Sequence, residues 1–395
     1  MIPVSEALAQ LFALMTPTPT ERVGLAQARG RVLAAPVTAR RDQPPFAASA
    51  MDGYAVPEGA VPGAVFTVIG EARAGERFGG RVGPGQAARI FTGAPIPEGA
   101  VRVVIQEDVT REGNRITLSD GLDAGPHIRP AGGDFRTGDV FAAPRRLGPG
   151  EIALLAAMNC AEVTVHRRPE VALIATGDEL VQPGETPGPD QIVASNSYGL
   201  KALVEDAGCI ARLLPIARDT MESLDTVLGL AEGADLIVTI GGASVGDHDL
   251  VAKALTARGA DMAFHKVAMR PGKPLMAGKL PEGVLGGAAL IGLPGNPVSA
   301  LVCGHVFLRP ALDARHGLPP RPAARRRAVL GEPIAANGPR EHYLRARTDA
   351  EGRVAAATRQ DSALLSVLAD ADCLIVRPPH APAAAPGETV ETLPL

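Results

Sequence analysis

The sequence LIVTIGGASVGDHD, residues 236–249, joins an apolar run to a loop of glycines and acids. We interpret LIVTI as a strand, and a glycine loop leaving a strand turns backbone N–H groups outward, which suits a phosphate or another oxyanion. Asp247 and Asp249 follow in the same loop, although carboxylates repel anions. Two interpretations stay open: the acids cap a helix, or a cation lies between the two kinds of group.

The residues around this loop alternate apolar strands with helices. The expected strands are VALIAT (171–176), CIARLLPIA (209–217), DLIVTI (235–240) and ALIGL (289–293), and the expected helices span about 197–207, 220–232, 249–258 and 297–313. Such alternation predicts a parallel sheet with helices on both faces. We therefore assign residues 169–318 to one α/β domain.

Every expected strand of this domain ends in a glycine loop or a carboxylate. Ligands of open parallel sheets bind beyond the carboxyl ends of the strands. Glu179, Asp219 and Asp249 follow three different strands, and helix capping alone does not explain their convergence, so we predict functional roles for them. Asp247 is better explained as a capping group, and His248 as a surface residue.

The loop LPGNPVSA, 293–300, and the loop HKVAMRPGKP, 265–274, border the same crevice in this interpretation. In the first, Asn296 is an expected N-cap and Pro297 the first helical residue. The second carries Lys266, Arg270 and Lys273. These cations could be a solvated surface, but a place beside an anion-binding crevice favours contact with phosphate. Carboxylates would then hold Mg²⁺, which bridges phosphate oxygens and reconciles the charges.

The N-terminal residues and residues 147–160 show helical spacing. Apolar residues recur at helical intervals in 4–15 and again in 21–35, which predicts two short helices. We expect all three helices to pack together. They would form a small discontinuous helical domain from residues 1–43 and 140–168.

Two further segments have the patterns of β domains. Residues 44–139 alternate apolar residues with glycine and proline breaks, and VRVVIQEDV followed by REGNRITL predicts a hairpin. After a Pro/Arg-rich linker, residues 319–395 carry short strands and predict a C-terminal β domain. The fold class is therefore α/β plus β, in several domains.

Bulk composition excludes several classes of protein. The net charge is −4, and no basic block is dense enough for a nucleic-acid backbone. We find neither an apolar stretch of the ~18 to 20 residues that span a bilayer nor a leader peptide, so we expect a cytoplasmic protein without a membrane partner. The four cysteines are far apart without CxxC pairing, which favours reduced thiols over zinc or disulfides.

Eight segments resemble, in the same order, the MoeA family of molybdopterin molybdotransferases, which also occurs as the E domain of gephyrin. The segments are PPFAASAMDGYAV (44–56), RIFTGAPIPEGA (89–100), HIRPAGGDFRTGD (127–139), ATGDEL (175–180), SNSYGL (195–200), IGGASVGDHD (240–249), RPGKP (270–274) and LPGNPVSA (293–300). The resemblance covers nearly the whole chain.

The resemblance implies an L-shaped subunit of four domains, with a molybdopterin-binding α/β domain and a β-barrel-like C-terminal domain. It implies a homodimer whose active site combines the α/β domain of one copy with the β domain of the other. The implied reaction takes adenylylated molybdopterin and molybdate to molybdenum cofactor and AMP, with Mg²⁺ as the usual metal. Molybdopterin adenylyltransferase and recipient molybdoenzymes are implied as further partners.

The resemblance also assigns site residues. Asp52 and Thr92 match active-site positions of the β domain, although a hairpin turn and a turn hydroxyl would explain them without function. The other matching acids are Asp134, Glu179, Asp219 and Asp249, of which the last three would hold metal. The ligand-binding positions are Gly241, Gly242, Ser244, Gly246, Lys266, Arg270, Lys273, Pro294, Gly295 and Asn296. The chain departs from the family at Gly133, where glutamate is frequent, and at Ala243, where valine is common.

Two alternatives stay open. A molybdopterin adenylyltransferase shares the GGxSxGxxD pattern but usually lacks the MDGYA and TGAPIP segments. A scaffold with the same fold would bind other proteins without catalysis, and it would not need an intact acid cluster. All the acids compared are present in this chain.

Overall fold

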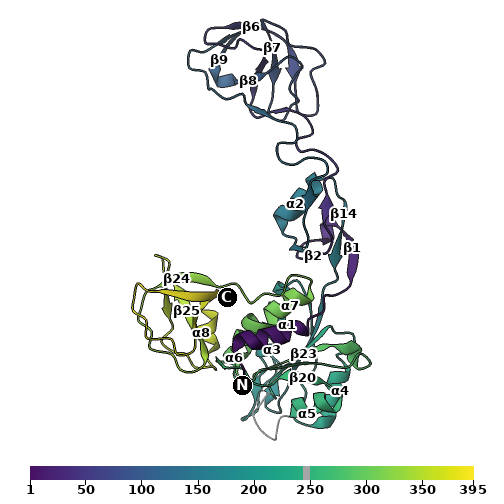
Figure 1. Ribbon diagram of the computed structural model, residues 1–395, viewed down its shortest axis with the longest axis vertical. Coiled ribbons are helices and arrows are strands. Elements are labelled where there is room, and N and C mark those ends of the chain that lie inside the picture. The colour runs from purple at the N-terminus through teal and green to yellow at the C-terminus, as the bar shows by residue number, and fades with distance from the viewer. Residues whose placement is uncertain (243–249) are drawn as a thin grey trace.

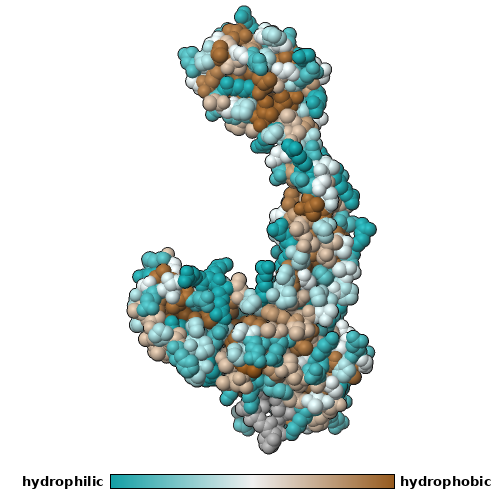
Figure 2. Space-filling view, viewed as in Figure 1, coloured by the Kyte–Doolittle hydropathy of each residue, from teal (hydrophilic) through white to brown (hydrophobic). Residues whose placement is uncertain are grey.

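The computed structural model describes residues 1–242 and 250–395. The chain is elongated: one β domain lies at one end of the longest axis, a slim unit follows it, and the α/β and C-terminal domains lie at the other end (Figure 1). In Figure 2 apolar side chains gather on the β domain beside its narrow connection to the slim unit. Among the described residues, no helix has both the length and the apolar character needed to cross a bilayer.

The α/β domain contains the predicted parallel sheet, extended by two antiparallel strands. The order is β18-β15-β19-β23-β22-β20, and the first four strands are parallel. Strand β22 runs antiparallel to β23, and β20 runs antiparallel to β22. The bounds are β15 Glu170–Ala175, β18 Ile210–Leu213, β19 Leu236–Ile240, β20 Asp261–Phe264, β22 Met276–Lys279 and β23 Ala289–Leu293. The chain reverses its direction of strand addition between β15 and β19, which makes this the switch point of the sheet.

Helices cover both faces of this sheet, as predicted. They are α3 Asn196–Asp206, α4 Met221–Gly229, α5 Leu250–Ala257, α6 Pro297–Cys303 and α7 Arg309–Arg315, with a π-helical turn Gly304–Leu308 between the last two and a 3-10 turn at Leu285–Gly287. Alternate residues of β15 point to opposite faces. Leu173 joins the core under α3, α6 and α7, whereas Ile174 joins the core under α4 and α5.

The N-terminal helix forms as predicted, but its predicted packing is wrong. Helix α1, Val4–Ala13, buries Val4, Leu8 and Leu11 in the core of the α/β domain, against β20 and α7. It therefore does not pack beside the helix of residues 147–160. The apolar face of α1 can bury more surface against the large core of the α/β domain than against the slim unit.

The predicted helix over 21–35 is also wrong. These residues form β1 Thr20–Gly24, a 3-10 turn Leu25–Gln27 and β2 Val32–Leu33, and Gly30 at φ +74° interrupts any helix. Strand β1 pairs along its whole length with β14, Glu162–His166, and this non-local pairing overrides the local pattern.

The slim unit is therefore a small sheet with one helix. Its helix α2, Pro149–Ala157, forms where helical spacing predicted it. The sheet order is β1-β14-β2-β13, with β13 at Arg145–Arg146. A second pair, β3 Val37–Thr38 with β12 Val140–Phe141, also joins the two distant segments, so the unit is discontinuous in sequence.

Both predicted β domains are present. The first has the strand order β8-β5-β7-β6-β10-β9. A hairpin forms within the predicted segment as β9–β10, but the VRVVI part of that segment forms β8 and pairs with β5. The strands of this domain are β5 Gly53–Val56, β6 Val65–Ala72, β7 Gln86–Ile90, β8 Arg102–Ile105, β9 Val109–Glu112 and β10 Arg115–Leu118, with a 3-10 turn Gln106–Asp108 and the short pair β4 Ala48–Ser49 and β11 Ile128–Arg129. Two apolar cores lie within it.

The C-terminal sheet closes on itself, because β25 pairs with both β26 and β27. Its strands are β24 Arg326–Leu330, β25 Glu341–Thr348, β26 Arg353–Ala356, β27 Cys373–Arg377 and β28 Thr389–Pro394, and α8 Leu365–Ala369 lies beside them. Strand β21, Met269–Arg270, belongs to the α/β domain by sequence but pairs with β25. One loop of the α/β domain is thus built into the C-terminal sheet.

Candidate functional site

A cavity of about 910 Å³ lies at the switch point of the parallel sheet. Its lining includes residues that directly follow three strands: Gly177 after β15, Gly241 and Gly242 after β19, and the loop Pro294–Asn296 after β23. The carboxyl ends of neighbouring parallel strands meet at one edge, which is why segments far apart in sequence converge here. The predicted crevice is therefore present.

The glycine pair after β19 can only be glycine. Gly241 and Gly242 have φ +92° and +65°, a region that side chains rarely tolerate. A Cβ atom on Gly241 would lie 2.7 Å from the Thr176 carbonyl oxygen, and one on Gly242 would clash with Val251 Cγ2. The Gly241 N–H donates to the Leu293 carbonyl at 3.0 Å, so this amide serves the sheet and is not available to a ligand.

The loop after β23 also differs from expectation in its hydrogen bonds. Asn296 is the N-cap of α6 and Pro297 its first residue, as predicted, but the Asn296 side chain makes no capping bond. The Val298 N–H of the first turn donates instead to the Ser362 carbonyl, at 3.0 Å. Asn196 Nδ2 donates to the Gly295 carbonyl at 2.7 Å and fixes this loop beside α3. Asn296 thus lies on the cavity wall with an exposed side chain.

Acidic side chains gather at the end of β15. Glu179 and Asp219 line the cavity, and the Asp219 N–H donates to Asp178 Oδ1 at 3.1 Å. Burial raises the pKa of Asp219, and the negative charges of Asp178 and Glu179 raise it further. The nearby cation of Arg218 is engaged by the Asp178 and Leu180 carbonyls, at 3.0 and 3.1 Å. Asp178 is a member of this cluster that the candidate set did not include.

Part of the predicted site lies outside the described residues. Ser244, Gly246 and Asp249 belong to this part, as do Asp247, His248 and Ala243. Within 1–242 and 250–395, no three His, Cys, Asp or Glu side chains form a group suited to a metal ion. Of the three predicted metal ligands, Glu179 and Asp219 line one cavity, and Asp249 lies outside the described residues.

The three predicted cations lie next to the cavity and not in its wall. Lys266, Arg270 and Lys273 are exposed, and their loop reaches the lining through Pro274. Arg270 pairs in register with His342 of β25. Burial, with a further contribution from the positive charges of the neighbouring arginines, lowers the pKa of His342 to about 4. The basic loop therefore sits at the junction with the C-terminal domain.

The C-terminal domain contributes a wall that sequence reasoning missed. Ala363 lines the cavity. Arg345, which is fully buried, donates from Nη2 to the Asp361 carbonyl at 3.1 Å and so holds this segment. Its Nε and Nη1 have no hydrogen-bond partner in the described part of the chain. Arg345 lies inside an expected strand of a separate domain, so the sequence did not mark it as part of the site. Lys253 also lines the cavity, and it could have been singled out because it is one of only five lysines in the chain.

In the β domain, Asp52 and Thr92 come together as the resemblance implies. The Thr92 N–H and hydroxyl donate to Asp52 Oδ1 at 2.7 and 2.8 Å. These two bonds lower the pKa of Asp52, with a smaller contribution from Arg89. The β domain and the α/β domain lie at opposite ends of the chain (Figure 1), so one copy does not bring this pair to the cavity.

Asp134 stands apart from both groups. It is exposed on the segment that leads from the β domain to the slim unit, and its N–H donates to the Gln43 carbonyl at 2.9 Å. No contact of its carboxylate with Asp52 or Thr92 is present.

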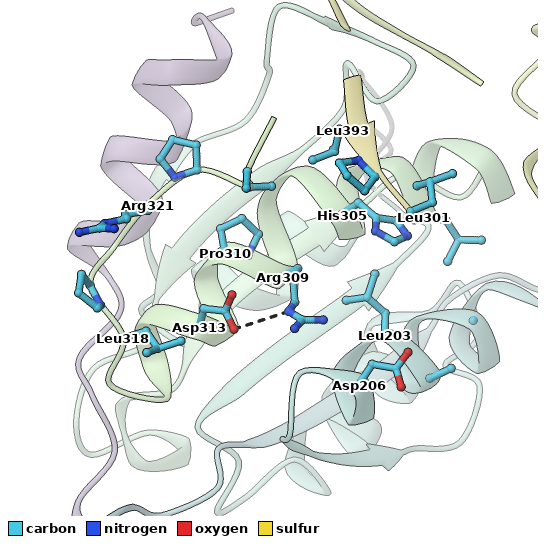
Figure 3. Close-up of a pocket in the computed structure, with 18 residues that line it drawn as sticks. Leu203, Asp206, Leu301, His305, Arg309, Pro310, Asp313, Leu318, Arg321 and Leu393 are labelled. Atoms are coloured by element: carbon cyan, nitrogen blue, oxygen red, sulfur yellow. Dashed lines mark ion pairs between the residues drawn. The ribbon is translucent and has the colours of Figure 1, made fainter. Parts of the chain in front are cut away.

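A second cavity, of about 760 Å³, lies between α3, α7 and the linker to the C-terminal domain. Figure 3 shows Arg309 and Asp313 paired in its wall, at 3.6 Å. Asp313 also binds Arg146 at 2.7 Å. Among the predicted site residues that the structure describes, none lines this cavity, so we place the functional site at the switch point.

An α/β domain with a cavity at the switch point of its parallel sheet, together with a β domain on a long arm and a closed C-terminal β domain, defines a multidomain protein with a candidate ligand site in the α/β domain. Three family models match in sequence order: "MoeA N-terminal region (domain I and II)" over residues 2–159, "Probable molybdopterin binding domain" over 172–314, and "MoeA C-terminal region (domain IV)" over 327–395. The chain belongs to the MoeA family.

Curated relatives and solved structures agree. A molybdopterin molybdenumtransferase of Nostoc sp. is 40% identical over 76% of this chain and 70% of its own length. One of Staphylococcus aureus is 31% identical over 99% of this chain and 95% of its own. A crystal structure of the Pyrococcus horikoshii MoeA protein, 27% identical, covers 100% of both chains with a TM-score of 0.81. The resemblance, the fold class and the expectation of a transferase are confirmed, and neither alternative is favoured.

Proposed function

We propose that this chain inserts molybdenum into adenylylated molybdopterin and releases AMP. The observation that carries the proposal is the switch-point cavity, in which a glycine pair and the acids Glu179 and Asp219 converge within a chain that matches MoeA models along its length. Glycine lets ligand atoms approach the backbone closely, and clustered acids suit a metal-assisted reaction of a phosphoanhydride.

A divalent metal, Mg²⁺ by our proposal, would be held by Glu179 and Asp219 together with Asp249. The fit rests on charge: the pKa of Asp219 is raised in part by Asp178 and Glu179, and a cation would relieve this repulsion. When bound, the metal would polarise the phosphoanhydride. Asp178 would keep the Asp219 backbone in place through its hydrogen bond.

Basic residues around the cavity would neutralise the negative charge of the substrate. Lys266, Arg270 and Lys273 border the cavity on the side of the C-terminal domain, and Arg345 is a buried cation behind the same wall. Cations placed where charge develops lower the barrier to the departure of AMP. The Asn296 side chain, exposed on the loop after β23, would bind the pterin.

We propose a homodimer with a shared site, because Asp52 and Thr92 lie far from the cavity of their own chain (Figure 1). A second copy would bring its β domain to the cavity. Molybdate is an anion and would be repelled by ionised Asp52. We therefore propose that Asp52 orients Thr92 through its two hydrogen bonds, and that Thr92 contacts molybdate.

The proposed setting is the cytoplasm, where the four buried cysteines would stay reduced. There the chain would receive its substrate from a molybdopterin adenylyltransferase and pass its product to recipient molybdoenzymes.

The deciding experiment mixes the purified protein with adenylylated molybdopterin, molybdate and Mg²⁺. We expect AMP release and reconstitution of a cofactor-free molybdoenzyme. Consumption of ATP in the presence of molybdopterin, without molybdate, would instead support an adenylyltransferase. Absence of product with any divalent metal would contradict the proposal.

A further inference from the structure

Two large apolar side chains are exposed on the wall of the switch-point cavity. Ile192 and Val193 are 58% and 41% exposed, and both line the cavity. They form β17, Ile192–Val193, which pairs in parallel with β16, Leu180–Val181. Consecutive residues of a strand point to opposite faces, so Ile192 shares its face with its register partner Leu180 and not with Val193. Single exposed apolar residues are common on proteins, but an exposed one beside a second apolar residue within a ligand cavity leaves an apolar surface for a ligand to cover. We refer to Leu180 and Ile192, which both line the cavity, as the apolar shelf.

Hydrogen bonds fix the apolar shelf beside the acid cluster. The Ile192 N–H donates to the Glu179 carbonyl at 2.8 Å, so the strand is attached to the backbone of a proposed metal ligand. The Leu180 carbonyl accepts from Arg218 Nη1 at 3.1 Å, and the Ala194 N–H donates to the Val181 carbonyl at 2.9 Å. The shelf is therefore a built part of the site and not a passing loop.

The shelf has no use in binding phosphate or metal. Those groups need charges, hydroxyls or backbone amides, which the acids and glycines at the strand ends supply. A branched aliphatic surface instead suits the flat face of an aromatic ring, whose polar edge stays free for hydrogen bonds. The two polar residues that follow the shelf in the cavity wall, Ser195 and Asn196, place such groups near the ring edge.

We propose that the apolar shelf binds a planar heterocycle of the substrate and so determines its ring specificity. The inference rests on the proposed function, which supplies a substrate with two such rings, the adenine and the pterin. Both rings share the required chemistry.

The test measures binding of three probes by titration calorimetry: AMP, ribose 5-phosphate and 6-hydroxymethylpterin. Ribose 5-phosphate has the sugar and phosphate of AMP without the ring. The variants are Ile192→Ser, Ile192→Val and, as a matched control, Ile210→Ser. Ile210 is 43% exposed on a strand of the same domain and does not line the cavity.

We expect Ile192→Ser to weaken the binding of one ring-containing probe by about tenfold, because most of the apolar contact is lost. Ribose 5-phosphate should bind as before, Ile192→Val should stay within about twofold, and Ile210→Ser should match the wild type. A loss for AMP places the adenine on the shelf, and a loss for the pterin places the pterin there. Unchanged binding of both rings by Ile192→Ser would overturn the inference and leave the proposed function standing.

Two other results would also count against it. Wild-type protein that binds neither ring would overturn both the inference and the proposed function. If Ile192→Ser leaves ring binding intact but dissociates a wild-type dimer in sedimentation velocity, the shelf is a contact between protein copies and the inference is wrong.

Discussion

Thr92 donates two hydrogen bonds to a single carboxylate oxygen of Asp52, from its backbone N–H at 2.7 Å and from its hydroxyl at 2.8 Å. Because 40 positions separate the two residues, this contact fixes the end of β7 against the start of β5. The hydroxyl hydrogen is engaged by Asp52, so the lone pairs of the Thr92 oxygen face away from that carboxylate. The pair therefore presents an oriented side chain, and Asp52 is held ionised by the bonds that it accepts.

Replacing Thr92 with valine should reduce the rate of AMP release by about 10- to 100-fold, the range expected when a hydrogen bond to a charged group is lost. Thr92→Ser keeps the hydroxyl and should retain most of the activity. Assays at saturating adenylylated molybdopterin with varied molybdate separate an effect on molybdate binding from an effect on the maximal rate. A valine variant with wild-type kinetics would remove Thr92 from the site.

Asp219 should oppose folding stability at neutral pH. Its pKa is raised above the ordinary value of 3.8 in the folded chain, so the folded state binds the proton more tightly than the unfolded state does. Protonation therefore stabilises the fold, and this contribution is lost as the pH rises through the folded pKa. We expect Asp219→Asn to raise Tm at pH 7 by about 1 to 2 °C, a small effect because the group is mostly exposed.

The same substitution should abolish Mg²⁺-dependent AMP release. Mg²⁺ should raise the Tm of the wild type more than that of Asp219→Asn, since the metal relieves repulsion among Asp178, Glu179 and Asp219. Asp206→Asn, at an exposed acid outside this cavity, serves as the control. Equal Mg²⁺ shifts in all three proteins would rule out metal binding at Asp219.

Gly242→Ala should destabilise the α/β domain. The new Cβ would meet Val251 at a positive φ, and the combined strain should lower Tm by about 2 to 6 °C. The double variant Gly242→Ala with Val251→Ala relieves the clash and should recover part of the loss. Gly229→Ala is the control, because within the described residues its added Cβ would have no atom within 4 Å apart from its own helix backbone and chain neighbours. A Gly242→Ala protein as stable as this control would contradict the predicted strain at Gly242.

Arg345→Met should preserve stability but weaken the binding of anionic substrate. Arg345 is fully buried with two nitrogen atoms unpartnered in the described chain, and burial lowers its pKa. An apolar side chain of similar length avoids the cost of unpaired buried donors. We expect Tm to hold or rise while KM for adenylylated molybdopterin increases at least about fivefold. A fall in Tm without a change in KM would assign Arg345 a purely structural role.

The parallel sheet was predictable because its signal is local. Each of β15, β19 and β23 is a short apolar run followed by glycine or acid, and the alternation with helices fixes the topology. The carboxyl ends of such strands must meet, so Glu179, Asp219 and Gly241 were found from sequence. The antiparallel strand β20, Asp261–Phe264, lies where a short strand was predicted before the basic loop, whereas β22, Met276–Lys279, has no comparable alternation and was missed.

The remaining differences come from contacts between distant segments. Residues 21–35 have helical spacing, but each residue of β1 pairs with a residue of β14 that lies 138 to 146 positions away along the chain. Helix α1 was predicted from its local spacing, but its position in the fold depends on the core in which Leu8 and Leu11 are buried. Ala363 lines the cavity, with Arg345 holding its segment from behind, where β21 joins the C-terminal sheet to the basic loop. No local pattern encodes these choices.

A shared active site predicts complementation between two defective variants. Thr92→Val should strongly impair the β-domain half of a site, and Asp219→Asn should inactivate the α/β half. In a mixed dimer, one site would receive Thr92 from one copy and Asp219 from the other, while the second site would carry both defects. Equal mixing makes half the dimers mixed, so about a quarter of wild-type activity should return. Co-expression with two different affinity tags, followed by tandem purification, isolates the mixed dimer, which should show about half. If the isolated mixed dimer is no more active than its parents, each site is built from one chain, and the position of Asp52 and Thr92 at the far end of the molecule would need a domain movement within that chain.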